Sequence, residues 1–193
     1  PLHSSAASDV YKRQELDVYL TSVTDHYSTA SICGPNSKKI LKKLFPDKDF
    51  SDEAFPHMSY QSAKIDNAEC RIMRISFTGE LSYEINIESK YGKSLWESCI
   101  IAGEEYKITP YGTETMHLLR AEKGFIIVGQ DTDGTMTPID LQMDWIVSKK
   151  KYDFIGKRSL YRSDTIREDR KQLVGLLTDC LLYTSPSPRD LSE

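Results

Sequence analysis

The sequence lacks the features that mark nucleic-acid binders, membrane proteins and exported proteins. Basic residues are not in excess, since 25 Lys and Arg stand against 29 Asp and Glu, for a formal net charge of -4. A surplus of cationic side chains is what binds phosphates, so a nucleic-acid partner is not expected. The chain has no apolar run near the ~18 residues of a membrane-spanning helix, and no signal-like segment opens it. We therefore expect a cytoplasmic protein with no membrane partner.

Cysteine pairs and glycine-rich phosphate loops are also missing. The four cysteines show neither a Cys-x-x-Cys spacing nor a paired histidine spacing; they are Cys33, Cys70, Cys99 and Cys180. This pattern predicts neither a metal site nor a disulfide framework, and it favours small buried thiols. Neither G-x-x-x-x-G-K-[ST] nor G-x-G-x-x-G occurs, so the sequence predicts no nucleotide loop in this stretch.

What the chain does contain is enough apolar and aromatic material for a packed core. Hydrophobic residues make up 39%, and there are 11 Tyr and 6 Phe among 193 residues. Strand and helix patterns alternate along the interior. The predicted strands are 17–23, 27–33, 59–65, 68–77 and 82–87, and the predicted helices follow Pro35 and span 91–106 and 112–123. A half-buried sheet with amphipathic helices is expected.

The two ends differ from the interior. Residues 1–14 are rich in Ser and Ala without periodicity, and residues 180–193 carry a Ser-Pro-Ser-Pro pattern that fits no compact element. Both ends resemble translated adapter sequence, so we predict non-native tails at 1–14 and 180–193. The interior is then expected to be a fragment of a longer protein.

One strand carries a candidate binding residue. Residues 82–87 alternate, so Tyr83 and Glu84 are expected on opposite faces. A carboxylate accepts paired N–H donors, as it does from arginine, and therefore suits a flat guanidine-like heterocycle. The simpler alternative is a strand with a charged solvent face.

A set of ordered motifs carries a family resemblance. These motifs are GPNSKKIL at 34–41, FTGELSYEINI at 77–87, YGTETMHLLRAEKGFIIVGQDTDGTMTPIDL at 111–141, DFIGKRSL at 153–160 and KQLVGLL at 171–177. In order and spacing they resemble the folate-binding aminomethyltransferase family. Two of the stretches, 18–30 and 118–135, resemble alpha subunits of heterotetrameric sarcosine oxidases more than glycine-cleavage T-proteins.

The resemblance implies an α+β fold, with a partial folate-binding domain over 15–158 and the start of a C-terminal β-barrel at 159–179. It also implies a tetrahydrofolate site that captures the oxidised N-methyl group of sarcosine as 5,10-methylenetetrahydrofolate. Flavin and NAD would bind elsewhere in a hetero-oligomer with other sarcosine oxidase subunits. The piece alone is expected to be inactive. Two alternatives stay open: a stand-alone aminomethyltransferase of the glycine cleavage system, and a non-catalytic folate-binding regulator.

When the family's folate-binding residues are carried over to the matching positions of this sequence, the resemblance implies that Glu84 holds the pterin amidine. Tyr83 and Glu80 would lie nearby. Arg120 and Trp145 are implied as further folate-binding residues.

Two departures from the family pattern limit this assignment. Met116 stands where T-proteins tend to carry an arginine, so contact with the folate tail is expected to differ. The family's catalytic aspartate lies upstream of the matched region, and Asp25 does not match it. No catalytic residue and no metal ligand is therefore assigned in this chain.

Overall fold

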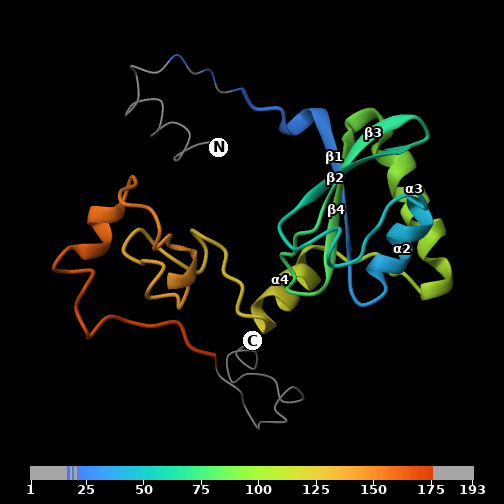
Figure 1. The fold of residues 1–193 in the computed structure, drawn as a ribbon. Helices are drawn as coiled ribbons and strands as arrows, with labels where there is room; N and C mark the ends of the chain where they lie inside the picture. The colour runs from blue at the N-terminus through green and yellow to red at the C-terminus, as the bar shows by residue number, and fades with distance from the viewer. Residues whose placement is uncertain (1–16, 18, 20, 176–193) are drawn as a thin grey trace, which may run out of the picture. The chain divides into compact units, whose positions relative to one another are not determined.

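The computed structural model describes residues 17, 19 and 21–175, which form parts of two compact units, 1–125 and 126–193 (Figure 1). The tails predicted at 1–14 and 180–193 lie outside the described residues and stay predictions. Within the described part, no helix has both the length and the apolar character needed to cross a bilayer.

The first unit is built on a four-stranded antiparallel sheet in the order β1-β4-β3-β2. The strands are β1 (Tyr27–Cys33), β2 (Tyr60–Ile65), β3 (Ala68–Met73) and β4 (Ser82–Glu88). β4 pairs with a strand on each side, whereas β1 forms one edge. Each strand alternates buried and more exposed side chains, so the sheet has one core face and one open face. The predicted half-buried sheet is confirmed.

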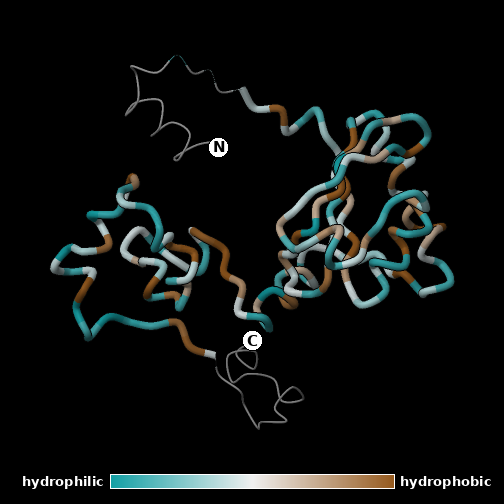
Figure 2. Tube along the Cα trace, in the orientation of Figure 1, coloured by the Kyte–Doolittle hydropathy of each residue, from teal (hydrophilic) through white to brown (hydrophobic). Residues whose placement is uncertain are grey.

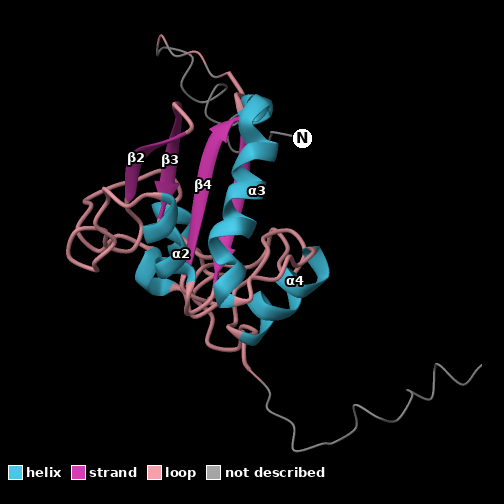
Figure 3. Cartoon of the chain, turned by 90° about the vertical axis from the view of Figure 1, so that its right-hand side faces the viewer, coloured by secondary structure: helices cyan, strands magenta, loops and turns pink. Residues whose placement is uncertain are grey.

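Helices pack on the core face. α2 (Ser37–Leu44) buries Ile40 and Leu41, and α3 (Gly92–Gly103) packs on α2 and β1, as Figure 3 shows from its side of the sheet. The lysines of α2 lie on its outer side, where Lys38 and Lys43 each form an ion pair of 2.8 Å. α4 (Thr113–Glu122) ends before Gly124, whose φ of +73° suits the predicted glycine stop.

Buried cysteines contribute to this core as expected. Cys70 and Cys99 are each 3% exposed, and burial raises the pKa of each thiol to about 11. They are therefore protonated, apolar packing groups at neutral pH. Cys180 lies outside the described residues.

Two predicted elements differ from the structure. The strand predicted at 17–23 is wrong for the described residues of that range, because the chain there forms no ladder and then turns into a short 3-10 helix, Thr24–His26. β3 ends at Met73 instead of residue 77. Trp96 of α3 is 50% exposed, because α3 buries the stripe of Leu95 and Cys99 beside it.

The second unit has little regular structure. Among its described residues, 126–175, there are only two 3-10 helices, Asp144–Ile146 and Lys157–Tyr161. The described part of the predicted barrel, 159–175, forms no strand. That barrel and the 158/159 domain boundary stay predictions, while the division into compact units lies at 125/126.

Candidate functional site

The two neighbouring residues singled out on β4 lie on opposite faces of the sheet, as the alternation predicts. Tyr83 is fully buried and packs against Phe50 and Phe55, with ring centroids 6.3 Å and 5.8 Å away. Burial raises the pKa of the Tyr83 phenol. Tyr83 is thus a core aromatic that holds β4 against the helix side of the sheet.

Glu84 lies on the open face and is half-buried. Burial raises the pKa of its carboxyl above the usual value. Among the described residues, its carboxylate forms neither a hydrogen bond nor an ion pair. A partly desolvated carboxylate without a protein partner is costly, and a ligand with two N–H donors removes that cost.

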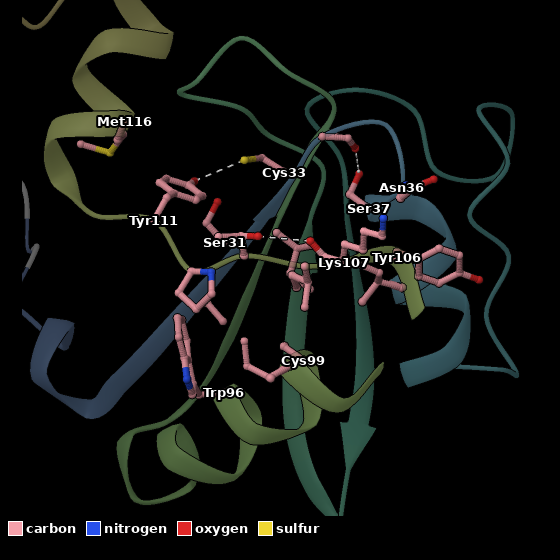
Figure 4. A pocket seen from close by; sticks show the side chains of 18 of the residues that line it. Ser31, Cys33, Asn36, Ser37, Trp96, Cys99, Tyr106, Lys107, Tyr111 and Met116 are labelled. Carbon is pink, nitrogen blue, oxygen red and sulfur yellow. Dashed lines mark hydrogen bonds between the residues drawn. The ribbon is translucent and has the colours of Figure 1, made fainter. Parts of the chain in front are cut away.

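Hydroxyl and thiol groups lie near Glu84 on the same face. Ser31 of β1 is its direct partner across the ladder, and Cys33 follows on the same side of β1. The Cys33 thiol donates to Tyr111 Oη at 3.4 Å (Figure 4). Our sequence reasoning did not single out these three residues, although the alternation of 27–33 places Ser31 and Cys33 on one face.

A cavity of about 470 Å³ runs along the β1 edge beside these groups. Its lining includes Ser31, Cys33, Tyr111 and Met116, and from α3 Trp96 (Figure 4). The cavity therefore joins open-face hydroxyls to an apolar wall, which is the composition of a site for a flat ring system.

The turn at residues 77–80 packs on the C-terminal end of α4. Gly79 has φ +78°, and a Cβ there would lie 2.3 Å from Lys123 Cγ. Glu80 pairs with Lys123 Nζ at 3.2 Å, while both side chains stay partly exposed, so the pair itself contributes little. The backbone of Gly79 is what permits this close approach.

Arg120 supports the same end of α4. It is 8% exposed, and its Nη1 donates to the carbonyl of Phe125 at 3.1 Å. The amide of Phe125 donates back to the Arg120 carbonyl at 2.8 Å. This reciprocal contact fixes the turn through Gly124.

Trp145 lies in the second unit, in the 3-10 helix Asp144–Ile146, and is 73% exposed. The structure thus brings Ser31, Cys33 and Tyr111 together near Glu84, and places Glu80 beside α4. Among the described residues, no group of three or more His, Cys, Asp or Glu side chains has the arrangement of a metal site.

Comparisons with known proteins agree with the motif pattern. The chain is 58% identical over 164 residues to the sarcosine oxidase subunit alpha of Corynebacterium sp. (strain P-1), covering 84% of this chain and 17% of that subunit. It is 34% identical over 142 residues to the aminomethyltransferase of Chlorobium limicola, covering 74% of this chain and 39% of that protein. It is 33% identical over 145 residues to the mitochondrial dimethylglycine dehydrogenase of Homo sapiens, covering 75% of this chain and 17% of that protein.

The chain therefore spans 17% of the length of the Corynebacterium subunit it matches. The family profile described as the GCVT N-terminal domain matches residues 3–151, which is most of the chain. On this match, and with an antiparallel sheet and helices as its observed architecture, the chain belongs to the GCVT N-terminal domain family.

Proposed function

We propose that this chain is the tetrahydrofolate-binding one-carbon acceptor region of a sarcosine-oxidising complex. In that role it receives the oxidised N-methyl carbon, which leaves as 5,10-methylenetetrahydrofolate. Relatives named sarcosine oxidase subunit alpha and dimethylglycine dehydrogenase support an oxidoreductase acting on CH–NH groups of N-methyl amines. The relative named aminomethyltransferase supports folate use.

The observation that carries the proposal is the half-buried carboxylate of Glu84, which the described residues leave without a partner. The 2-amino-4-oxo edge of a pterin presents two adjacent N–H donors, and a carboxylate accepts both at once. Tetrahydrofolate supplies the nitrogen nucleophiles that take up the one-carbon unit. In this proposal Glu84 binds and orients the ring.

The other implied residues take supporting roles in this proposal. Tyr83 holds β4 in place from the core, and Glu80 with Arg120 fixes the turn and the helix end beside it. Trp145 is proposed as a further folate contact. The complete protein is proposed to assemble with other subunits, since one relative is named as a subunit alpha, and to carry flavin and NAD elsewhere. A stand-alone aminomethyltransferase is the second candidate, supported by the 34% identity to such an enzyme.

The test is the affinity of the 193-residue chain for tetrahydrofolate, measured by anaerobic titration calorimetry, before and after Glu84→Gln. Loss of a charged hydrogen-bond acceptor predicts a fall of about 10- to 100-fold in affinity. Glu88→Gln is the matched control, because Glu88 lies on the same face of the same strand but is exposed and pairs with Lys90. Equal affinities for the parent and the Glu84 variant, with unchanged melting temperatures, would refute the assignment.

A further inference from the structure

Tyr111 lies where it can act on whatever Glu84 binds. It sits directly before α4 and reaches back to β1, where its Oη lies 3.4 Å from Cys33 Sγ (Figure 4). Cys33 and Ser31 share the open face of β1, and Ser31 is the ladder partner of Glu84. The phenol is thus close enough to the Glu84 carboxylate for the charge of Glu84 to act on it.

The hydrogen-bond arrangement leaves the phenol proton available. The Cys33 thiol donates to Tyr111 Oη, so the oxygen acts as an acceptor in that contact. The Ser31 hydroxyl also hydrogen-bonds the phenol oxygen and lowers the pKa of Tyr111, which places it as a second donor to that oxygen. The phenol keeps one proton of its own to donate. Burial raises the pKa of Tyr111 to about 12, since the Cys33 contact and the charge of Glu84 add to it and outweigh the opposing hydrogen bond with Ser31. The hydroxyl is therefore a donor across the physiological pH range.

A carboxylate beside a hydroxyl donor is a specific recognition pattern. Along the edge of a 2-amino-4-oxo heterocycle, two N–H donors are followed by a carbonyl acceptor. Glu84 accepts from the two donors, and a neighbouring O–H meets the carbonyl. In a 4-amino analogue an N–H donor replaces that carbonyl, so the phenol proton no longer has a ring acceptor.

We propose that Tyr111 is a specificity-determining residue, which favours 4-oxo over 4-amino heterocycles by donating its phenol proton to the 4-oxo oxygen. This inference rests on the proposed function, because it takes Glu84 as the residue that binds the ring. It adds a residue, and a selection between ligands, that the carboxylate alone does not provide.

The experiment measures the affinities of the 193-residue chain for folic acid and for 4-amino-4-deoxyfolic acid, which differ at the 4-position. In the parent, folic acid binds more tightly. Tyr111→Phe keeps the ring and removes the hydroxyl, and is expected to weaken folic acid binding about 5- to 10-fold, as loss of one hydrogen bond does. Binding of the 4-amino analogue changes little, so the ratio of the two affinities collapses.

Tyr60→Phe is the control, since Tyr60 lies on β2, is 67% exposed and is not among the residues that line the cavity. Its two affinities should match those of the parent. An unchanged ratio in Tyr111→Phe, or an equal loss for both ligands, overturns the role of Tyr111 and leaves the proposed function standing. A parent chain that binds neither ligand overturns both. If Tyr111→Phe fails to fold, Cys33→Ala removes the contact that holds the phenol and must lower the ratio in the same direction.

Discussion

Asp140 and Arg170 form the most buried ion pair among the described residues, and they connect two stretches of the second unit. Their side chains are 2% and 11% exposed, and the guanidinium contacts both carboxylate oxygens, at 2.8 Å and 2.5 Å. The Asp140 carboxylate also accepts from the Thr137 amide at 2.7 Å. The Arg170 guanidinium holds the pKa of the Asp140 carboxyl far below its usual value, because its hydrogen bonds lower that pKa more than desolvation raises it.

Asp140→Asn is therefore expected to destabilise the second unit, because it leaves the Arg170 guanidinium without its partner. A lowered native-state pKa contributes stability that is complete above the unfolded pKa of about 4 and disappears as pH falls towards the native-state pKa. The difference between parent and variant should thus be full at pH 7 and shrink below about pH 4. Urea unfolding followed by far-ultraviolet circular dichroism at a series of pH values measures it.

Asp169→Asn is the control for this substitution. Asp169 is adjacent to Arg170, yet its side chain is 75% exposed and contacts Arg167 only at 3.5 Å. Its replacement should change the free energy of unfolding by less than about 0.5 kcal/mol. If both variants lose equal stability, the buried pair is not what stabilises this unit.

Single residues also show which features of the candidate site the sequence predicts and which it does not. Period-2 alternation was enough to separate Tyr83 from Glu84, because a side chain's face on a strand is a local property. The neighbours of Glu84 were not found, since the Cys33–Tyr111 contact joins residues 78 positions apart. Such a pairing depends on the path of the chain between them, which no local pattern encodes.

At the scale of elements, the turn at 77–80 matters because its backbone touches α4. The φ of +78° at Gly79 is unfavourable for any residue with a Cβ, and Lys123 Cγ would lie 2.3 Å from that atom. Gly79→Ala should lower stability by about 2 kcal/mol, combining backbone strain with displacement of Lys123. Gly134→Ala is the matched control, because a Cβ there meets nothing within 4 Å and φ is not positive.

Differential scanning calorimetry compares these two glycine variants. A fall of several degrees in melting temperature is expected for Gly79→Ala and almost none for Gly134→Ala. Equal melting temperatures would mean that the turn does not pack on α4 as described. Folate affinity of Gly79→Ala then reports whether this turn also positions β4, which begins three residues later.

A predicted strand is confirmed where an alternating sequence pattern also has a neighbouring strand to pair with. The strand at 27–33 is confirmed with the same bounds as β1, because its apolar positions alternate and β4 offers a complementary edge. The stretch 17–23 has a similar β-branched composition, yet its described residues pair with no strand. Strand propensity measures fit to a half-buried pleated surface, so it fails where no neighbouring strand supplies one.

At the scale of the whole chain, the two units differ in what stabilises them. The first has a sheet whose strand β4 is hydrogen-bonded on both sides, and Ile72 of β3 and Ile85 of β4 are fully buried on its core face. The described part of the second has no sheet and no α-helix, and hydrophobic stretches recur along its trace (Figure 2). Many of its large apolar side chains are exposed. Val128, Trp145 and Tyr152 are 83%, 73% and 94% exposed.

This contrast predicts the order in which the units open. Backbone amides are protected from exchange when their hydrogen bonds lie in a cooperative, buried structure, and regions with few buried apolar contacts open at low free energy. Hydrogen–deuterium exchange should therefore be slowest in β3 and β4 and faster throughout 126–175, with only the amides around the Asp140–Arg170 pair partly protected. An apolar dye is expected to bind the native chain, because exposed apolar side chains offer it a surface. Protection over 126–175 equal to that of β4, together with no dye binding, would show that the second unit is stabilised by a core of its own.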